Sequence, residues 1–312
     1  MVGHSSSQKS LPLPPAHLGV ADLRLWLAAQ LAEGGIPDSA LEADIILAWL
    51  LGCDQSGLIL QHRRVPGEQL LHRLQEVLCR RLGREPLAYI MGEWEFWSLP
   101  FKVGPPVLIP RPETELLVEQ ALEFALQWAT RSPAGGEEPM RILDLGSGSG
   151  ILAVVLAREL PEARVVAVDL SPAALELARE NARRHRVEGR ISFVTSSWLS
   201  ALAPQCRFDL VVSNPPYVVR GELPRLQPEV RDYEPRSALD GGGDGLDEIR
   251  EIKETLPPLL EAGGALLMEI GWDQGEAVKL LFEADLRYSQ VSVLPDLAGL
   301  PRVLRCRRTR YC

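Results

Sequence analysis

The chain has 312 residues, which is long enough for one large domain and a smaller one, each with its own core. Its formal net charge of −9 and pI near 5.2 argue against a general nucleic-acid-binding protein, whose binding surface would be basic. The sequence contains neither an apolar run of membrane-spanning length nor a secretion leader, so we expect a cytoplasmic protein.

The cysteines and histidines give no sign of a metal site, because none of them occurs at metal-ligand spacing. We therefore predict no bound metal. The five cysteines are also an odd number, which favours a reducing compartment over a disulfide-bonded framework.

The N-terminal part of the chain reads as a tail followed by helices. Residues 1–18 are rich in serine and proline and contain no acidic residue, which predicts a flexible tail. Apolar residues then recur at helical spacing from Ala21, after a cap at Asp38 or Ser39, and again over residues 67–82. We interpret residues 19–85 as a helical substrate-recognition domain, although the same apolar stripes are also explained by an ordinary core.

A connector and a long helix come next. Residues 86–106 are predicted to form a strand-rich connector that contains a hairpin. Pro112 fits the first turn of a helix that runs to about Thr130, and residues 132–139 are predicted to be a flexible link. Arg111, Glu113 and Glu115 either close a ligand channel or merely favour the start of this helix, and both interpretations remain open.

The rest of the chain alternates between predicted strands and helices. The strands are expected at 141–145, 164–169, 191–194, 208–212, 264–270, 288–294 and 302–307, and the helices at 151–160, 172–185, 246–260 and 274–283. This alternation predicts an α/β, Rossmann-like domain over residues 107–312, with a parallel sheet covered by helices on both faces. Ligands of such sheets bind outside the carboxyl ends of the strands.

A glycine loop after the first of these strands predicts a nucleotide-cofactor site formed by Gly146, Ser147, Gly148, Ser149 and Gly150. A dinucleotide fingerprint would need its third glycine where this chain has Ile151, so NAD is disfavoured. Asp169, at the end of the next strand, could accept both ribose hydroxyls, an arrangement that suits S-adenosylmethionine. Alternatively, Asp169 caps the following helix.

The run Asn214-Pro215-Pro216-Tyr217 follows another predicted strand. Two successive prolines fix two φ angles and remove two backbone donors, which predicts a rigid corner rich in hydrogen-bond acceptors. The Asn214 side-chain oxygen and the Pro215 carbonyl could accept both N–H groups of a planar amide and orient its nitrogen, while Tyr217 packs against the amide plane. The alternative is a simple loop breaker after a strand.

These motifs resemble the HemK/PrmC family, the methyltransferases that modify the glutamine of the Gly-Gly-Gln motif in class 1 peptide chain release factors. The resemblance covers about residues 20–307 and includes 86–96, 109–115, 234–242, 269–271, and 296–299 with Arg302.

The resemblance implies a class I methyltransferase fold with S-adenosylmethionine held by Gly146 to Gly150 and by Asp169. It further implies that Trp198 lies beside the adenine and that Asn214 touches both donor and substrate. From the amide chemistry of the corner, we predict that Asn214, Pro215, Pro216 and Tyr217 form the substrate site. The chain departs from the family at Ser197, where an acidic residue commonly hydrogen-bonds the adenine amino group.

Other substrates fit the same corner. A ribosomal-protein glutamine would use it unchanged, and so would the exocyclic amine of adenine, although base-flipping enzymes need the basic surface that this acidic chain lacks. A non-catalytic binding module would have no need of the acceptor geometry. We therefore predict release factors as the partners, no direct contact with nucleic acid or membrane, and a monomer.

Overall fold

The computed structural model describes residues 14–131 and 138–310; the predicted tail up to residue 13 and residues 132–137 of the predicted link lie outside this part of the chain. The chain divides into two compact units, Met1–Met91 and Gly92–Cys312, which are described separately. The boundary falls inside the predicted connector, just before its hairpin.

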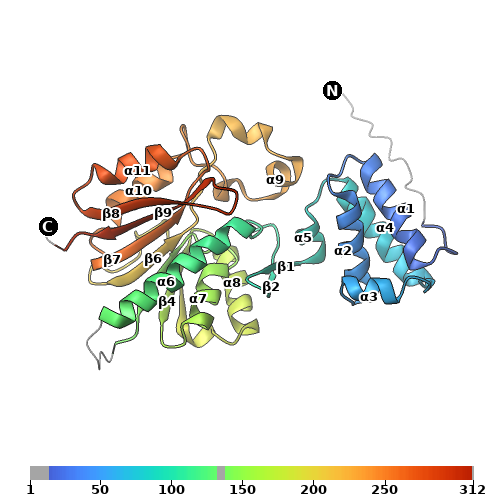
Figure 1. Ribbon diagram of the computed structural model, residues 1–312, viewed down its shortest axis with the longest axis horizontal. Coiled ribbons are helices and arrows are strands. Elements are labelled where there is room, and N and C mark those ends of the chain that lie inside the picture. Colours follow the sequence, from blue (N-terminus) through green and yellow to red (C-terminus); the bar gives the residue numbers. More distant parts are fainter. Residues whose placement is uncertain (1–13, 132–137, 311–312) are drawn as a thin grey trace. The chain divides into compact units, whose positions relative to one another are not determined.

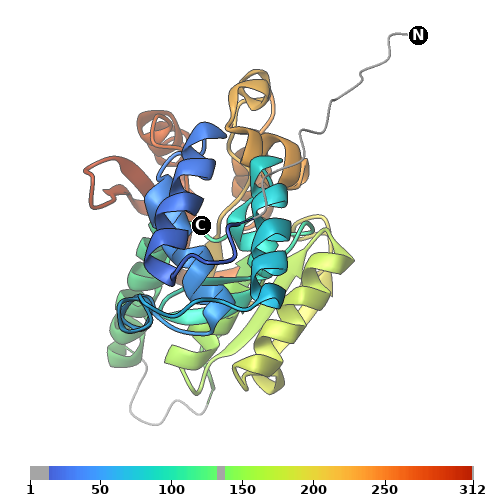
Figure 2. The same cartoon turned by 90° about the vertical axis from the view of Figure 1, so that its right-hand side faces the viewer.

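The first unit is helical (Figures 1 and 2). Its helices are α1 (Val20–Glu33), α2 (Ser39–Leu51), α3 (Gln55–Leu60), α4 (Glu68–Leu82) and α5 (Leu87–Met91). Leu23, Leu27 and Leu31 of α1 are fully buried against apolar residues of α2 and α4. The i, i+4 spacing of these leucines is the pattern that predicted the helix.

Two helices in this unit differ from the sequence prediction. Leu87–Met91 was expected to belong to a strand-rich segment, but it forms α5. Four of its five apolar residues are buried, and so short a continuous apolar run carries no periodicity that distinguishes helix from strand. Helix α3 was not predicted; the Asp54 carboxylate caps it by accepting a 2.7 Å hydrogen bond from the Gly57 N–H.

The second unit begins with a hairpin of β1 (Glu93–Phe96) and β2 (Leu99–Lys102), as expected. Asn181 joins this hairpin to the rest of the unit, because its fully buried amide bonds both the N–H and the carbonyl of Lys102 and also the Ser149 carbonyl. A short 3-10 turn, Pro112–Thr114, then leads into α6 (Glu115–Arg131), in agreement with the predicted helix start.

The main sheet has the strand order β5-β4-β3-β6-β7-β9-β8. Its strands are β3 (Arg141–Leu145), β4 (Arg164–Asp169), β5 (Ile191–Thr195), β6 (Phe208–Ser213), β7 (Leu260–Glu269), β8 (Tyr288–Pro295) and β9 (Pro301–Arg308). The helices that follow α6 are α7 (Ile151–Glu159), α8 (Pro172–Arg184), α9 (Pro228–Tyr233), α10 (Asp247–Thr255) and α11 (Gly275–Glu283). Helix α9 was not predicted.

The expectation of a parallel sheet is correct for β3 to β7 and wrong for β9. Strand β9 lies antiparallel to both β7 and β8 and is inserted between them. No helix separates β8 from β9 in the chain, so the two strands form a hairpin, which can only be antiparallel.

Helices cover both faces of the sheet. Ile142 of β3 packs into one core with α6 and α7, whereas its neighbour Leu143 packs into the other with α10 and α11. This alternation follows from the two-residue repeat of a strand, in which successive side chains point to opposite faces. The sheet is thereby buried on both sides.

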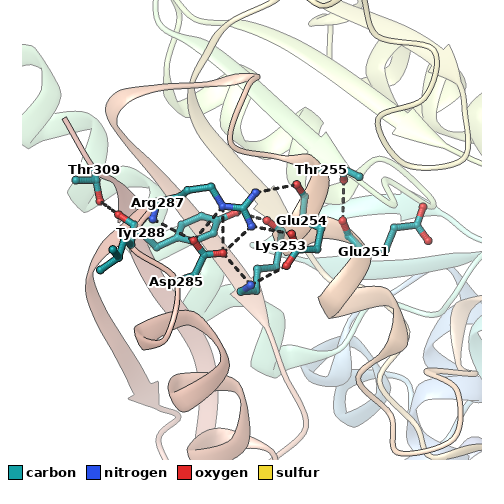
Figure 3. Close-up of polar contacts among 9 residues, drawn as sticks. Glu251, Lys253, Glu254, Thr255, Asp285, Arg287, Tyr288 and Thr309 are labelled. Carbon is teal, nitrogen blue, oxygen red and sulfur yellow. Dashed lines mark hydrogen bonds and ion pairs between the residues drawn. The ribbon is translucent and has the colours of Figure 1, made fainter. Parts of the chain in front are cut away.

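A cluster of charged residues joins α10 to the start of β8 (Figure 3). Lys253 Nζ and Arg287 Nη2 lie 2.8 and 2.6 Å from Asp285 Oδ2, and the Tyr288 hydroxyl donates to the Lys253 carbonyl at 2.8 Å. Hydrogen bonding from Arg287 lowers the pKa of Asp285. These contacts attach α10 to the start of β8.

None of the helices in the described residues combines the length and the apolar character that a membrane span requires.

Candidate active site

A cavity of about 490 Å³ lies in the second unit, a volume typical of small-molecule sites. Among the residues singled out from the sequence, its lining includes Gly146, Ser147, Gly148, Ser149, Asp169, Trp198, Asn214 and Pro216. Gly150, Pro215 and Tyr217 are not part of the lining, although their neighbours in the chain are. The structure thus brings the glycine loop, Asp169 and the proline corner to one cavity.

The pairing of β3 with β6 brings the glycine loop and the corner together. Leu145 and Ser213, the last residues of the two strands, are register partners. Gly146 and Asn214 therefore follow side by side, and a Cβ on Gly146 would lie 3.9 Å from the Asn214 carbonyl oxygen. Here the strand order changes direction, the place where α/β sheets bind their ligands.

The glycine loop has a conformation that needs its glycines. Gly146, Gly148 and Gly150 have φ angles of 73°, 55° and 80°, in the left-handed region that disfavours other residues. A Cβ on Gly148 would meet nothing within 4 Å, whereas one on Gly150 would lie 2.9 Å from the Cβ of Ala178 in α8. Gly148 thus leaves room for a ligand, and Gly150 lets α7 and α8 approach closely.

Asp144 stabilises the glycine loop through hydrogen bonds. Its Oδ2 accepts hydrogen bonds from the Ser147 hydroxyl at 2.6 Å and from the Ala153 N–H at 3.1 Å. Its other oxygen is buried with no hydrogen-bond partner in the described part of the chain. Burial raises the pKa of Asp144 to about 7, opposed by those two hydrogen bonds.

Asp169 ends β4 and lines the cavity. Its Oδ2 accepts the Gly148 N–H and its Oδ1 the Ser171 N–H, each at 2.8 Å. Each carboxylate oxygen retains a further lone pair, so the group can still receive hydroxyl donors from a ligand. The cap of α8 is the Ser171 hydroxyl, which accepts the Ala174 N–H, and the helix-cap explanation of Asp169 is therefore not needed.

Trp198 forms one wall of the cavity in a backbone conformation unusual for an aromatic residue, with a φ of 45°. A Cβ on Gly146 would lie 3.7 Å from its ring, so the indole lies beside the glycine loop. Its ring nitrogen donates to Glu248 Oε2 at 2.7 Å. Ser197 also lines the cavity, together with Glu248 and Glu251.

The proline corner is supported by a buried carboxylate. Asn214 Nδ2 donates to Thr114 Oγ1 at 3.3 Å, and the Thr114 hydroxyl donates to Glu269 Oε2 at 2.6 Å. The Tyr217 hydroxyl donates to the other oxygen of Glu269 at 3.3 Å. Burial, with the Glu269 charge, raises the pKa of Tyr217, which therefore remains a donor. No local motif predicts a role for Thr114 or Glu269, although both lie in runs that carry the family resemblance, 109–115 and 269–271.

Two interpretations, a ligand channel or a helix start, were left open for the charged residues at the start of α6, and they apply to different residues. Arg111 lines the cavity and pairs with buried Glu234 at 2.5 Å, while burial raises the pKa of Glu234. Glu115 instead accepts the Trp97 N–H at 2.8 Å, which fixes the hairpin to the helix start. Glu113 is not part of the cavity lining.

Comparison with known proteins decides the family. The chain is 44% identical over 279 residues to a release factor glutamine methyltransferase of Geobacter sulfurreducens, covering 89% of this chain and 93% of that protein. A relative of the same name from Bradyrhizobium diazoefficiens is 41% identical and covers 93% of this chain and 95% of that protein. The chain belongs to the release factor glutamine methyltransferase family.

Two further matches agree with this family. The PrmC N-terminal domain family matches residues 22–92 and the Methyltransferase small domain family matches residues 133–226. Among solved structures, the hMettl16 catalytic domain in complex with MAT2A 3′UTR hairpin 6 has a TM-score of 0.52 at 14% identity, covering 78% of this chain and 83% of that one. That likeness shows the methyltransferase fold alone.

As a member of the release factor glutamine methyltransferase family, the chain is an S-adenosylmethionine-dependent methyltransferase. The residues present suit this cofactor. The open space at Gly148 leaves room beside the loop backbone, Asp169 offers carboxylate lone pairs, and Trp198 offers an aromatic face.

Proposed function

We propose that this protein transfers a methyl group from S-adenosylmethionine to the side-chain amide nitrogen of the glutamine in the Gly-Gly-Gln motif of peptide chain release factors. The observation that carries the proposal is the adjacency of Gly146 and Asn214 at the ends of paired strands β3 and β6. A cofactor on the glycine loop and an amide on the corner would then meet in one cavity. The names of its relatives support the release factor as substrate.

The corner explains how an amide nitrogen can react. The lone pair of an amide nitrogen is delocalised into the carbonyl, so the nitrogen is a poor nucleophile until it is oriented. Asn214 Oδ1 and the Pro215 carbonyl would accept the two N–H groups, and no donor to either atom is found among the described residues. When bound, S-adenosylmethionine supplies an electrophilic methyl group. The two acceptors hold the nitrogen in line and favour the positive charge that it acquires before it releases a proton.

We assign cofactor contacts to Gly146, Ser147, Gly148, Ser149, Gly150, Asp169, Trp198 and Asn214, and substrate contacts to Asn214, Pro215, Pro216 and Tyr217. Tyr217 fits this role through a ring anchored by its hydroxyl bond to Glu269. The helical unit would recognise the rest of the release factor. Its helix α3 exposes two consecutive apolar side chains, Ile59 at 74% and Leu60 at 85%. We expect a monomer that acts in the cytoplasm, where release factors work.

The test is mass spectrometry of a purified release factor after incubation with the protein and S-adenosylmethionine. We expect one added methyl on the Gly-Gly-Gln glutamine, and we expect it to be lost with Asn214→Ala. A ribosomal-protein substrate and DNA serve as parallel acceptors. Methylation of either one without methylation of the release factor would overturn the proposed substrate.

A further inference from the structure

A buried carboxylate lies behind the proline corner without a role in the function described so far. Glu269 ends β7, the strand beside β6, and only 1% of its surface is exposed. It is not part of the cavity lining. A carboxylate is costly to bury unless donors satisfy it, so its contacts indicate what it does.

Both oxygens of Glu269 receive hydroxyl donors from residues of the site. Thr114 donates to Oε2 at 2.6 Å and Tyr217 to Oε1 at 3.3 Å. Burial raises the pKa of Glu269, whereas the Thr114 hydrogen bond and the Arg302 charge act in the opposite direction. The short contact to Thr114 is of the length expected for a hydroxyl bound to an ionised acceptor.

The direction of the Thr114 bond fixes the next one. A threonine hydroxyl has a single hydrogen, and Thr114 gives it to Glu269. Thr114 Oγ1 can then only accept from Asn214, whose Nδ2 lies 3.3 Å away. The Asn214 amide is therefore held with its nitrogen toward Thr114, which leaves Oδ1 as the end that can accept a substrate N–H.

We infer that Thr114 and Glu269 are positioning residues that set the orientation of the Asn214 amide for the substrate nitrogen, an inference that rests on the proposed function. The opposite orientation would present Asn214 Nδ2 to a glutamine N–H, so that two donors would face each other. Glu269 also holds Tyr217, so one buried group orients two of the residues assigned to the substrate.

The inference is tested by changing the hydrogen-bonding groups while keeping the side-chain shapes. Thr114→Val removes the hydroxyl at nearly constant volume, and Thr114→Ser restores a hydroxyl. Glu269→Gln lets its new N–H group donate to Thr114, which frees the Thr114 hydrogen to turn toward Asn214 Oδ1. Thr309→Val, which removes a hydroxyl bonded to the Leu286 carbonyl at 2.8 Å outside the cavity lining, is the matched control.

Each variant is assayed for S-adenosylmethionine affinity by calorimetry and for kcat and KM on the release factor. We expect Thr114→Val and Glu269→Gln to lower kcat by about 10- to 100-fold with the cofactor affinity unchanged, because a misoriented acceptor mainly costs rate. Thr114→Ser should recover most of the rate and Thr309→Val should lose none. The double variant should be no slower than the slower single variant, since both act through one hydrogen-bond chain.

The result separates two failures. If the unaltered enzyme does not methylate the release factor, the proposed function is wrong. If the unaltered enzyme is active and Thr114→Val retains kcat within about twofold, or loses it only together with cofactor binding, the positioning role is wrong. Additive losses in the double variant would likewise overturn the shared chain.

Discussion

The indole N–H of Trp198 donates a 2.7 Å hydrogen bond to Oε2 of Glu248, at the start of α10. Both residues line the cavity, and Trp198 keeps a φ of 45° that an aromatic residue rarely adopts without support. Beside them lies Ser197, where the family commonly has an acidic residue. Glu248 thus supplies a carboxylate to the cavity wall that contains Ser197 and Trp198, although the chain has no acidic residue at position 197.

Replacement of Glu248 by leucine should weaken S-adenosylmethionine binding. A hydrogen bond to a charged group is worth about 1.5–3 kcal/mol, so the dissociation constant should rise by about tenfold or more as the indole loses its anchor. Calorimetric titration measures this change. Glu248→Gln, which keeps one acceptor, should give a smaller loss. An unchanged dissociation constant for Glu248→Leu would show that Trp198 needs no such anchor.

Asp144 predicts a pH dependence of stability in the absence of cofactor. Burial raises its pKa from 3.8 to about 7 in the folded protein. Between these values the folded state binds a proton that the unfolded state has released, so the stability contributed by this proton is present below about pH 4 and is lost as the pH rises toward 7. The loss is of the order of 4 kcal/mol at most, since each pKa unit corresponds to about 1.4 kcal/mol.

Denaturant unfolding between pH 4 and pH 8 tests this expectation. The variant Asp144→Asn carries an amide that does not titrate, yet its oxygen can still accept from the Ser147 hydroxyl and the Ala153 N–H. The free energy of unfolding of this variant should therefore fall less than that of the unaltered protein as the pH rises. Parallel curves for the two proteins would mean that Asp144 titrates normally.

Local motifs made much of this site predictable from the sequence. The glycine loop, Asp169 and Asn214 each follow a strand with a recognisable apolar run, and the carboxyl ends of parallel strands meet at one edge. The sequence did not predict the short helices α3 and α9 or the helical state of Leu87–Met91, because segments of five or six residues show too little periodicity.

The contacts that complete the site join distant parts of the chain. Trp198 and Glu248 are 50 residues apart, and Thr114 and Glu269 are 155 apart. Nothing in the local pattern at Glu269 distinguishes a buried hydrogen-bond acceptor from an ordinary charge at a strand end. The insertion of β9 between β7 and β8 is likewise set by sheet packing, whereas its antiparallel direction follows from the direct connection between β8 and β9.

Gly241 should be required for the shape of the proline corner. A Cβ there would lie 2.8 Å from the Tyr217 Cα and 2.9 Å from the Pro216 carbonyl oxygen, and backbone atoms cannot move aside cheaply. We expect Gly241→Ala to displace the corner and to lower kcat by about 10- to 100-fold, because small displacements of a positioning group cost rate steeply. The S-adenosylmethionine affinity should change little, since Gly241 does not line the cavity.

The control for this substitution is Gly243→Ala, two residues later. Its Cβ would meet nothing within 4 Å, so the rate should remain that of the unaltered enzyme. Equal rates for the two alanine variants would contradict the role assigned to the close approach at Gly241. Steady-state kinetics on the release factor distinguish the outcomes.

The exposed apolar end of α3 provides a test of the helical unit as the substrate-reading part. Ile59 and Leu60 are 74% and 85% exposed, and Val65 nearby is 55% exposed. Apolar side chains gathered on one surface segment are typical of a protein-binding site. We expect the double change Ile59→Ser with Leu60→Ser to raise KM for the intact release factor by about tenfold or more, as anchors at an interface usually cost over 1 kcal/mol each.

The same change should leave S-adenosylmethionine affinity and kcat at saturating release factor unaltered, because all the described residues that line the cofactor cavity belong to the second unit. A short peptide containing Gly-Gly-Gln serves as the second substrate. If α3 contacts the body of the release factor, methylation of the peptide should be equally slow with both enzymes. A loss of rate on the peptide as large as that on the intact factor would instead indicate general damage to the enzyme, and an unchanged KM for the intact factor would exclude this surface from recognition.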